Sequence, residues 1–256
     1  AGVDPNKTTF FVQSHVLEHS ELAWIFNCVT PVPELYRMTQ FKDKSERQDK
    51  NINSGLLTYP VLQAADILLY HGDIVPVGQD QIQHVELTRD VARWFNNRYG
   101  KYFPETKHLL TKVPKVMSLL DPNKKMSKSL GQGHVIELGD EPEVIAKKLS
   151  KAVTATAGGE GAPGVQNLLL FLNEFGDKNI YQDFLTAEMD GTIRYGDLKK
   201  AVAEAIANYF ADFREKRTEL LSHPEKLNKI LQKGADDARQ VAQKTMEQVR
   251  KMVGIR

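Results

Sequence analysis

The chain has 256 residues and a mass of 28.9 kDa, enough for one large domain or two smaller ones. It is 41% hydrophobic and 26% charged with a formal net charge of +1, a composition that excludes wholesale disorder, collagen and a coiled-coil rod. Because the charges nearly balance, any nucleic-acid site has to be local. No apolar stretch reaches the roughly 18 residues of a membrane span. The single cysteine, Cys28, excludes an internal disulfide and fits a reducing, cytoplasmic location.

Short β-rich runs alternate with helical periodicity in the first half of the chain, which is typical of a parallel sheet flanked by helices. Residues 8–12 are predicted to form a buried strand, and residues 33–41 a mixed helix or loop. Pro60 is expected in the first turn of a helix that continues to Tyr70. Residues 73–78 are predicted to form a second strand, and residues 81–99 a helix that Gly100 stops.

The later elements become increasingly helical. Residues 115–120 are predicted to be a third strand, ended by a turn at residues 121–123. Residues 154–164 are predicted to be flexible because Gly, Ala and Pro offer little surface to bury. Beyond Asp197 we expect helices with breaks at Pro224 and Gly234. The sequence therefore predicts an α/β core over residues 1–135 and an α-helical region over residues 136–256.

A lysine-rich segment directly follows the third predicted strand. Lys124, Lys125 and Lys128 repel one another unless an anion is bound, and the hydroxyls of Ser127 and Ser129 suit the same anion. A loop at the carboxyl end of a parallel strand lies where open α/β sheets bind ligands. It could stabilise charge on a phosphate during transfer. The alternative is a solvated basic turn.

The segment VPVGQDQ, residues 75–81, predicts a strand, a glycine turn and the start of a helix. Gly78 would let the backbone approach a ligand closely. Asp80 and Gln81 offer an acceptor and an amide suited to ribose hydroxyls and to the polar groups of an amino acid. In the alternative interpretation, Asp80 only caps the helix.

One face of the helix predicted over residues 59–70 carries polar side chains. Gln63, Asp66 and Tyr70 share this face at helical spacing, with Tyr59 one turn before Gln63. Because an unpaired buried carboxylate is costly, Asp66 is either on a thin solvent-facing stripe or paired within a pocket.

Residues 15–19 match the H-x-x-E-H pattern of inverted zincins. His15 and His19 lie at a strand–helix junction, and no third ligand can be identified from the sequence. We therefore predict no metal site in the protein. A Walker A loop, a G-x-G-x-x-G fingerprint and a G-x-S-x-G elbow are also missing from the sequence.

Four segments together resemble the bacterial tryptophanyl-tRNA synthetases, which are class I aminoacyl-tRNA synthetases: RMTQFKDK (37–44), AADILLY (64–70), VPVGQDQ (75–81) and KMSKS (125–129). The resemblance runs over nearly the whole chain. KMSKS alone indicates the class, whereas RMTQFKDK with AADILLY is more specific. The resemblance implies a Rossmann-type catalytic domain (1–135) that ends in the KMSKS loop, a helical domain (136–256) that contacts the tRNA anticodon, and a homodimer.

The implied reaction has two steps, in which L-tryptophan reacts with ATP to form tryptophanyl-adenylate and the acyl group then passes to tRNA(Trp). Mg²⁺ would accompany ATP, held mostly by phosphate oxygens. Asp66 would accept the indole N–H. The remaining tryptophan-binding residues implied by the resemblance are Tyr59, Gln63, Ile67 and Gln81. The implied ATP-binding residues are Gly78, Gln79, Asp80, Val116, Lys125, Met126, Ser127, Lys128 and Ser129, of which Lys125 and Lys128 would be catalytic.

The chain differs from the family pattern at three places. Gln63 stands where many members have Met, and its spacing to Asp66 is similar to that in tyrosyl-tRNA synthetases, so tyrosine specificity is an alternative, as is an inactive tRNA-binding relative. Gln79 stands where Glu is common. The HIGH-type motif that grips ATP should precede Ala1, and nothing in residues 1–256 replaces it. We therefore expect a fragment of a longer enzyme with little adenylation activity of its own.

Overall fold

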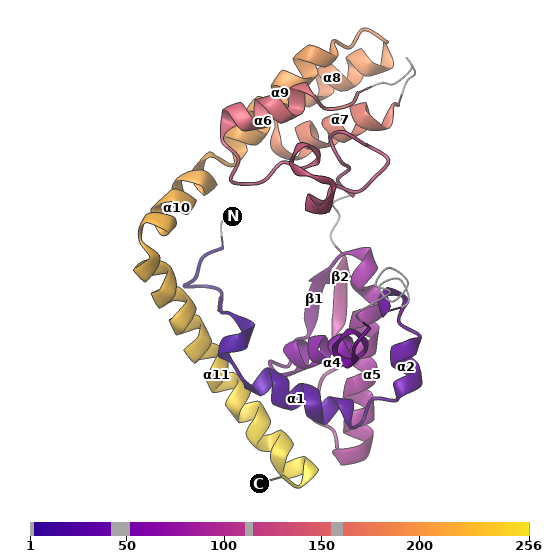
Figure 1. Ribbon diagram of the computed structural model, residues 1–256, viewed down its shortest axis with the longest axis vertical. Helices are drawn as coiled ribbons and strands as arrows, with labels where there is room; N and C mark the ends of the chain where they lie inside the picture. The colour runs from indigo at the N-terminus through magenta and orange to yellow at the C-terminus, as the bar shows by residue number, and fades with distance from the viewer. Residues whose placement is uncertain (1–2, 42–51, 111–114, 155–160, 256) are drawn as a thin grey trace. The chain divides into compact units, whose positions relative to one another are not determined.

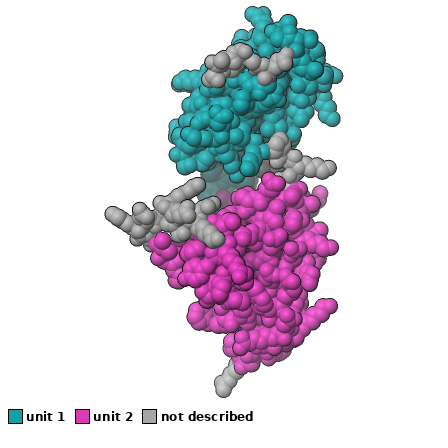
Figure 2. Space-filling model, turned by 90° about the vertical axis from the view of Figure 1, so that its right-hand side faces the viewer, with its two compact units in different colours: residues 1–3, 113–226 teal, residues 4–112, 227–256 magenta. Residues whose placement is uncertain are grey.

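A computed structural model describes residues 3–41, 52–110, 115–154 and 161–255. The chain divides into two compact units, each described by itself below (Figure 2). Unit 1 comprises residues 1–3 and 113–226, and unit 2 comprises residues 4–112 and 227–256. The two units meet along the chain at residues 112–113 and 226–227, whereas the boundary expected from the sequence is at residue 135. The KMSKS segment belongs to unit 1, and the end of the chain belongs to unit 2.

Unit 2 combines helices with a small parallel sheet (Figure 1). Strands β1 (Ile74–Val77) and β2 (Lys107–Leu110) pair in parallel, with Ile74 opposite Lys107. The helices are α1 (Glu18–Asn27), α2 (Val32–Tyr36), α4 (Ser54–Leu68), α5 (Ile82–Tyr99) and, from residue 227 onward, α11 (Pro224–Val253). Short 3-10 turns lie at Gln13–His15 and Gln79–Gln81.

Helix α4 lies in the apolar core of unit 2. Its residues Val61, Ala64, Ala65 and Leu68 are fully buried in one cluster with side chains from α1 and α5. Helix α11 adds Ala238, Ala242, Met246 and Val249 to the same cluster. Because α4 is buried on most sides, the polar residues on its remaining face are held in fixed positions.

Unit 1 is helical over most of its described length. It contains α6 (Pro142–Ser150), α7 (Pro163–Phe175), α8 (Lys178–Met189), α9 (Tyr195–Tyr209) and α10 (Ala211–Ser222). Apolar residues of α6, α7 and α9 form its core, among them Leu149, Leu168 and Leu198. Among the residues the structure describes, no helix has both the length and the hydropathy needed to cross a lipid bilayer.

Several predicted elements are confirmed. Strand β1 lies within residues 73–78, α5 begins at Ile82 and ends at Tyr99, directly before Gly100, and α9, α10 and α11 follow one another in the last quarter of the chain. Gly100 has a φ of 105°, which favours glycine and accounts for the helix end there. Residues 155–160 of the stretch predicted to be flexible lie outside the described residues.

The helix expected to begin at Pro60 begins earlier. Asn53 caps α4, because its side chain accepts a hydrogen bond from the amide of Leu56 over 3.1 Å. Pro60 therefore lies inside the helix rather than in its first turn. The Asn53 cap and the burial of apolar side chains stabilise α4 by more than the proline in its interior destabilises it. A proline is common in the first turn of a helix, which is why Pro60 predicts a later start.

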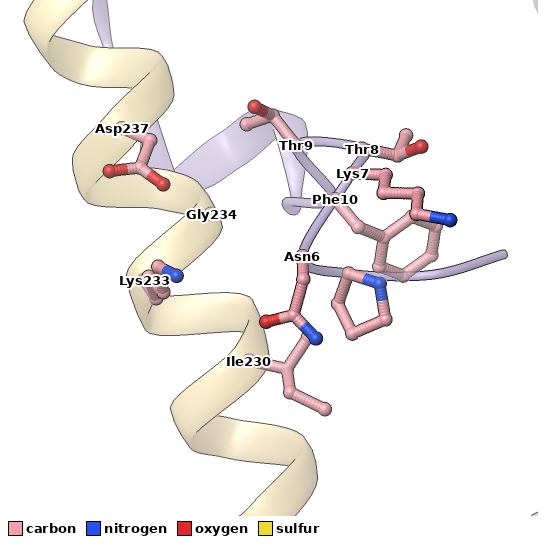
Figure 3. Close-up of a pocket in the computed structure, with 10 residues that line it drawn as sticks. Asn6, Lys7, Thr8, Thr9, Phe10, Ile230, Lys233, Gly234 and Asp237 are labelled. Atoms are coloured by element: carbon pink, nitrogen blue, oxygen red, sulfur yellow. The ribbon is translucent and has the colours of Figure 1, made fainter.

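The strand predicted at residues 8–12 is wrong, as is the break at Gly234. Residues 8–12 form no strand, and their chain runs beside α11. A Cβ atom added at Gly234 would lie 2.0 Å from the carbonyl oxygen of Phe10, so glycine permits this close approach (Figure 3). Gly234 therefore continues α11. A pocket of about 180 Å³ lies beside the contact, between residues 5–10 and α11.

The strand predicted at residues 115–120 is also wrong. Only an isolated antiparallel bridge joins Met117 to Lys125 there. The side chain of Asn167 binds both the amide and the carbonyl of Met117, which occupies the groups that a neighbouring strand would use. Strand β2, by contrast, was not predicted; two of its four residues, Lys107 and His108, are not apolar.

Candidate functional site

The first group of candidate residues lies in the turn after β1, in unit 2. Gly78 follows the strand and its carbonyl accepts a hydrogen bond from the amide of Gln81 over 3.0 Å. A Cβ atom at Gly78 would lie 2.8 Å from a carboxylate oxygen of Asp80, so a larger residue would displace that side chain. The other carboxylate oxygen accepts a hydrogen bond from Nε2 of Gln81 over 3.0 Å. Gln79, which lies between Gly78 and Asp80 in the chain, is exposed.

Gln40 links this turn to helix α4. The hydroxyl of Tyr59 lies 3.1 Å from Oε1 of Gln40 and donates to it, and Nε2 of Gln40 donates to the carbonyl of Asp80 over 3.1 Å. Nε2 of His84 is also 3.1 Å from the Tyr59 hydroxyl. Burial raises the pKa of Tyr59, which keeps the hydroxyl protonated. Gln40 belongs to the RMTQFKDK segment, of which Lys42, Asp43 and Lys44 lie outside the described residues.

Asp66, two turns further along α4, is a paired carboxylate. Nε2 of Gln13 lies 2.7 Å from each of its two oxygens, and Nδ1 of His19 lies 2.7 Å from Oδ1. The Asp66 side chain is 33% exposed. Of the two alternatives for this residue, the structure shows the pairing, while the side chain remains partly exposed. A half-buried, ionised acceptor suits recognition of an N–H group.

His19 also contacts Tyr70, one turn beyond Asp66. Its Nε2 lies 2.9 Å from the Tyr70 hydroxyl. Burial, with the nearby charge of Asp66, raises the pKa of Tyr70 to about 12. Among the described residues, no group of three or more His, Cys, Asp or Glu side chains could hold a metal ion. His19 of the H-x-x-E-H segment contacts both Asp66 and Tyr70.

The two other candidates on α4 are half-buried, Gln63 and Ile67. The carbonyl of Ile67 accepts a hydrogen bond from the amide of Gly72 over 3.1 Å. A Cβ atom at Gly72 would lie 3.2 Å from both the carbonyl oxygen and the Cγ2 atom of Ile67. The turn after α4 therefore packs tightly against Ile67 before the chain enters β1.

The second group of candidates lies in unit 1, around a tight antiparallel turn. The amide of Met126 donates to the carbonyl of Val116 over 3.0 Å, and the amide of Ser118 donates to that of Lys124 over 2.8 Å. Val116 and Met126 both pack against the core of unit 1. Val116 and Met126, the two apolar residues of the predicted ATP-binding set, are therefore neighbours, and the lysines of the turn are exposed.

The charged residues of this turn differ in their partners. Nζ of Lys128 lies 3.2 Å from Glu137, and Nζ of Lys124 lies 3.0 Å from Asp121. Lys125 is exposed and forms no ion pair with the described residues. The hydroxyls of Ser127 and Ser129 lie 2.8 Å apart, and Ser127 caps the 3-10 turn Lys128–Leu130. Lys128 and Glu137 line a pocket of about 410 Å³ together with Arg217.

The family model for class I tRNA synthetases (W and Y) matches residues 1–211. The chain belongs to this family. It is 47% identical to tryptophan–tRNA ligase 2 of Streptomyces avermitilis over 262 residues, which cover 99% of this chain and 77% of that protein. It is 44% identical to tryptophan–tRNA ligase of Wolinella succinogenes over 260 residues, with 99% and 78% covered.

Solved structures of the family confirm the predicted fold class. Tryptophanyl-tRNA synthetase from Campylobacter jejuni, complexed with ADP and tryptophan, superposes with a TM-score of 0.85 at 35% identity, over 99% of this chain and 79% of that one. The enzyme from Mycoplasma pneumoniae gives a TM-score of 0.85 at 37% identity, over 100% and 79%. Tyrosyl-tRNA synthetase from Aeropyrum pernix, at 22% identity and a TM-score of 0.59, shares the fold alone. The fold of this chain is therefore the class I fold, a Rossmann-type α/β domain with additional helices. The relatives named above support tryptophan over tyrosine as the amino-acid substrate.

Three residues of this family member were not predicted as part of the site: Gln13, His19 and Gln40. Gln40 stands inside a segment that carried the resemblance, and His19 stands inside a pattern considered only for metal binding. Gln13 and His19 both contact Asp66, from which they are separated by 53 and 47 residues along the chain. Such pairings follow from tertiary packing, so spacing along the chain does not reveal them.

Proposed function

We propose that the chain carries the tryptophan- and ATP-binding residues of a tryptophan–tRNA ligase, which forms tryptophanyl-adenylate and transfers the tryptophanyl group to tRNA(Trp). The paired carboxylate of Asp66 is the observation that supports the assignment most. Oδ1 accepts hydrogen bonds from Gln13 and His19, whereas Oδ2 accepts one, from Gln13. A carboxylate oxygen has two acceptor sites. Oδ2 can therefore receive the indole N–H.

The tryptophan pocket is proposed to surround this acceptor. Tyr59, Gln63 and Ile67, on the same helix, would line the indole ring, and Gln81 would bind the α-amino or carboxylate group. A buried acceptor that lacks its donor is costly, so the pocket would reject phenylalanine more firmly than an apolar slot would.

The candidate residues of each unit are proposed to contact ATP. In unit 2, the turn of Gly78, Gln79 and Asp80 would contact the adenosine part through its backbone, and in unit 1, Val116 would contact an adenine ring. Lys125 and Lys128 would contact the phosphates, while Met126, Ser127 and Ser129 complete the loop. Mg²⁺ would enter as part of the ATP substrate, with phosphates as its main ligands.

The chemistry would depend on positioning and charge. An oxygen of the tryptophan carboxylate attacks the α-phosphorus of ATP, and the bond from that phosphorus to the bridging oxygen breaks, which releases pyrophosphate. Lys125 and Lys128 would stabilise the charge that collects on the departing oxygens. In the second step the terminal ribose hydroxyl of tRNA attacks the acyl carbon, and AMP leaves.

Three further assignments extend the proposal. Residues 136–256 would include the surface that meets the tRNA anticodon, two copies of the chain would form a homodimer, and the protein would act in the cytoplasm. Analytical ultracentrifugation of the purified chain tests the dimer directly.

Separate calorimetric titrations of the chain with L-tryptophan, L-tyrosine and ATP test the proposed function, followed by tRNA(Trp). We expect tryptophan to bind and tyrosine to bind at least about tenfold more weakly, because the phenol ring would place its O–H at a different position from the indole N–H, and a lost hydrogen bond to a charged acceptor costs about 1.5–3 kcal/mol. Equal affinity for the two amino acids would contradict the proposal, as would the absence of tryptophan binding.

A further inference from the structure

We propose that His19 is a positioning residue that fixes the rotation of the Asp66 carboxylate, and so the direction of its acceptor site toward the substrate. The inference rests on the proposed function, in which Asp66 accepts the indole N–H. His19 lies on α1 and Asp66 on α4, and Nδ1 of His19 is 2.7 Å from Oδ1 of Asp66. His19 would not touch tryptophan itself and would act through the carboxylate.

The two contacts of His19 define its tautomer. An ionised carboxylate only accepts hydrogen bonds, so Nδ1 of His19 carries the hydrogen that Oδ1 of Asp66 accepts. In the neutral imidazole Nε2 is then an acceptor, and the Tyr70 hydroxyl 2.9 Å away donates to it. The order Tyr70 to His19 to Asp66 is thus a chain of donors that ends on Oδ1.

Packing holds this arrangement in place. The His19 side chain is 4% exposed, against 33% for Asp66. The ring of Phe11 lies 6.0 Å from the ring of His19 and 5.7 Å from that of Tyr70, measured between centroids. A buried imidazole that contacts two aromatic rings has few alternative orientations, so its N–H direction is set before any ligand arrives.

The two oxygens of Asp66 accept different numbers of hydrogen bonds within the protein. Gln13 reaches both oxygens equally, at 2.7 Å, and so does not distinguish them. His19 adds a second donor to Oδ1 alone. Oδ2 is left as the oxygen with capacity for the indole N–H. Without His19 the hydrogen bonds from Gln13 remain, but they bind both oxygens equally and fix the rotation of the carboxylate less firmly.

Two amide variants separate this role from general packing. The side-chain amide of His19→Asn lies about as far from the backbone as Nδ1 and can still donate to Asp66. The amide of His19→Gln lies about as far as Nε2, so it retains a partner for Tyr70 and leaves Oδ1 without its donor. Thermal unfolding of both variants checks that they fold.

The decisive comparison is between L-tryptophan and β-(3-benzothienyl)-L-alanine, in which sulfur replaces the indole N–H. We expect the wild-type chain to prefer tryptophan by about tenfold or more, because the analogue cannot donate to Asp66. His19→Asn should keep most of this preference, and His19→Gln should reduce it by about threefold or more. An equal preference in the wild type and His19→Gln would overturn the role of His19 while the proposed function stands. A wild-type chain without any preference would instead overturn Asp66 as the acceptor.

Nitrogen-15 NMR of the wild-type chain gives a second test that needs no ligand or variant. We expect the His19 ring to carry a hydrogen on Nδ1. A ring that carries a hydrogen on Nε2 and none on Nδ1 would overturn the inference, because Nδ1 could not then donate to Asp66.

Discussion

The side chain of Asn167 forms two hydrogen bonds with the backbone of Met117. The Met117 amide donates to Oδ1 over 2.9 Å, and Nδ2 donates to the Met117 carbonyl over 2.8 Å. Asn167 is 5% exposed and lies on α7 in the core of unit 1. It therefore anchors the strand-like chain that leads into the KMSKS segment, in place of a neighbouring strand.

Replacement of Asn167 by Ala should destabilise unit 1 by about 1–3 kcal/mol, because it leaves a buried amide and a buried carbonyl unpaired. Urea unfolding followed by circular dichroism measures the change. Asn173→Ala, at an exposed position of the same helix, is the matched control and should have little effect. Equal stability of the two variants would argue against the anchor.

Gly234→Ala should destabilise unit 2 even though Ala is the better helix former by about 1 kcal/mol. The new Cβ would meet the Phe10 carbonyl at 2.0 Å, and overpacking of this kind costs about 1–3 kcal/mol. Gly196→Ala in α9, where the added Cβ meets open space, should instead be neutral or stabilising. Melting temperatures of both variants decide the matter, and a rise for Gly234→Ala would refute the close contact.

The ion pair between Glu21 and Arg250 should make stability depend on pH. Nε of Arg250 donates to Glu21 over 2.7 Å, and this hydrogen bond lowers the pKa of Glu21 from its usual 4.5. A lowered folded-state pKa stabilises the protein above the unfolded value and loses that effect as pH falls through the folded value. Glu21→Gln should therefore cost about 0.5–1 kcal/mol at neutral pH and progressively less in acid. A pH-independent cost in urea unfolding would contradict this account.

Glu137 should compete with ATP for Lys128. The two side chains are 49% and 76% exposed, so their ion pair is weak, and phosphate oxygens would have to displace it. Glu137→Gln should strengthen binding of ATP or pyrophosphate by about two- to fivefold, and Lys128→Ala should weaken it. Lys128→Ala should leave tryptophan binding unchanged, because Lys128 is proposed to contact the phosphates and not the amino acid.

Lys124→Ala is the matched control for these two variants. Lys124 stands in the same turn but pairs with Asp121 at 3.0 Å, outside the KMSKS segment. It should leave the calorimetric affinities for ATP and pyrophosphate almost unchanged. Weaker ATP binding in Glu137→Gln would show that Glu137 supports the site instead of competing with its ligand.

Elements with strong local signals could be predicted from the sequence. Gly78 after a β-rich run marked the turn at the end of β1, and Gly100 marked the end of α5. The same logic failed at Gly234, because a glycine needed for close packing inside a helix has the same local signature as one that ends a helix.

Features that depend on distant partners could not be predicted in this way. Residues 8–12 and 115–120 have strand-like composition, but the first segment packs against α11 at Gly234 and the second is bound by Asn167 at Met117. The periodicity of α4 placed Asp66 on a polar face without revealing that Gln13 and His19 reach it from another segment. The site residues on one helix were thus predictable as a set, while the partners that orient them were not.

The central claim is that Asp66 recognises the indole of tryptophan, and tryptophan binding to Asp66→Asn measured by calorimetry tests it most directly. The variant keeps the shape of the side chain and removes the charge that accepts the N–H. We predict at least about tenfold weaker tryptophan binding with ATP affinity unchanged. Tryptophan affinity equal to that of the wild type would contradict the account.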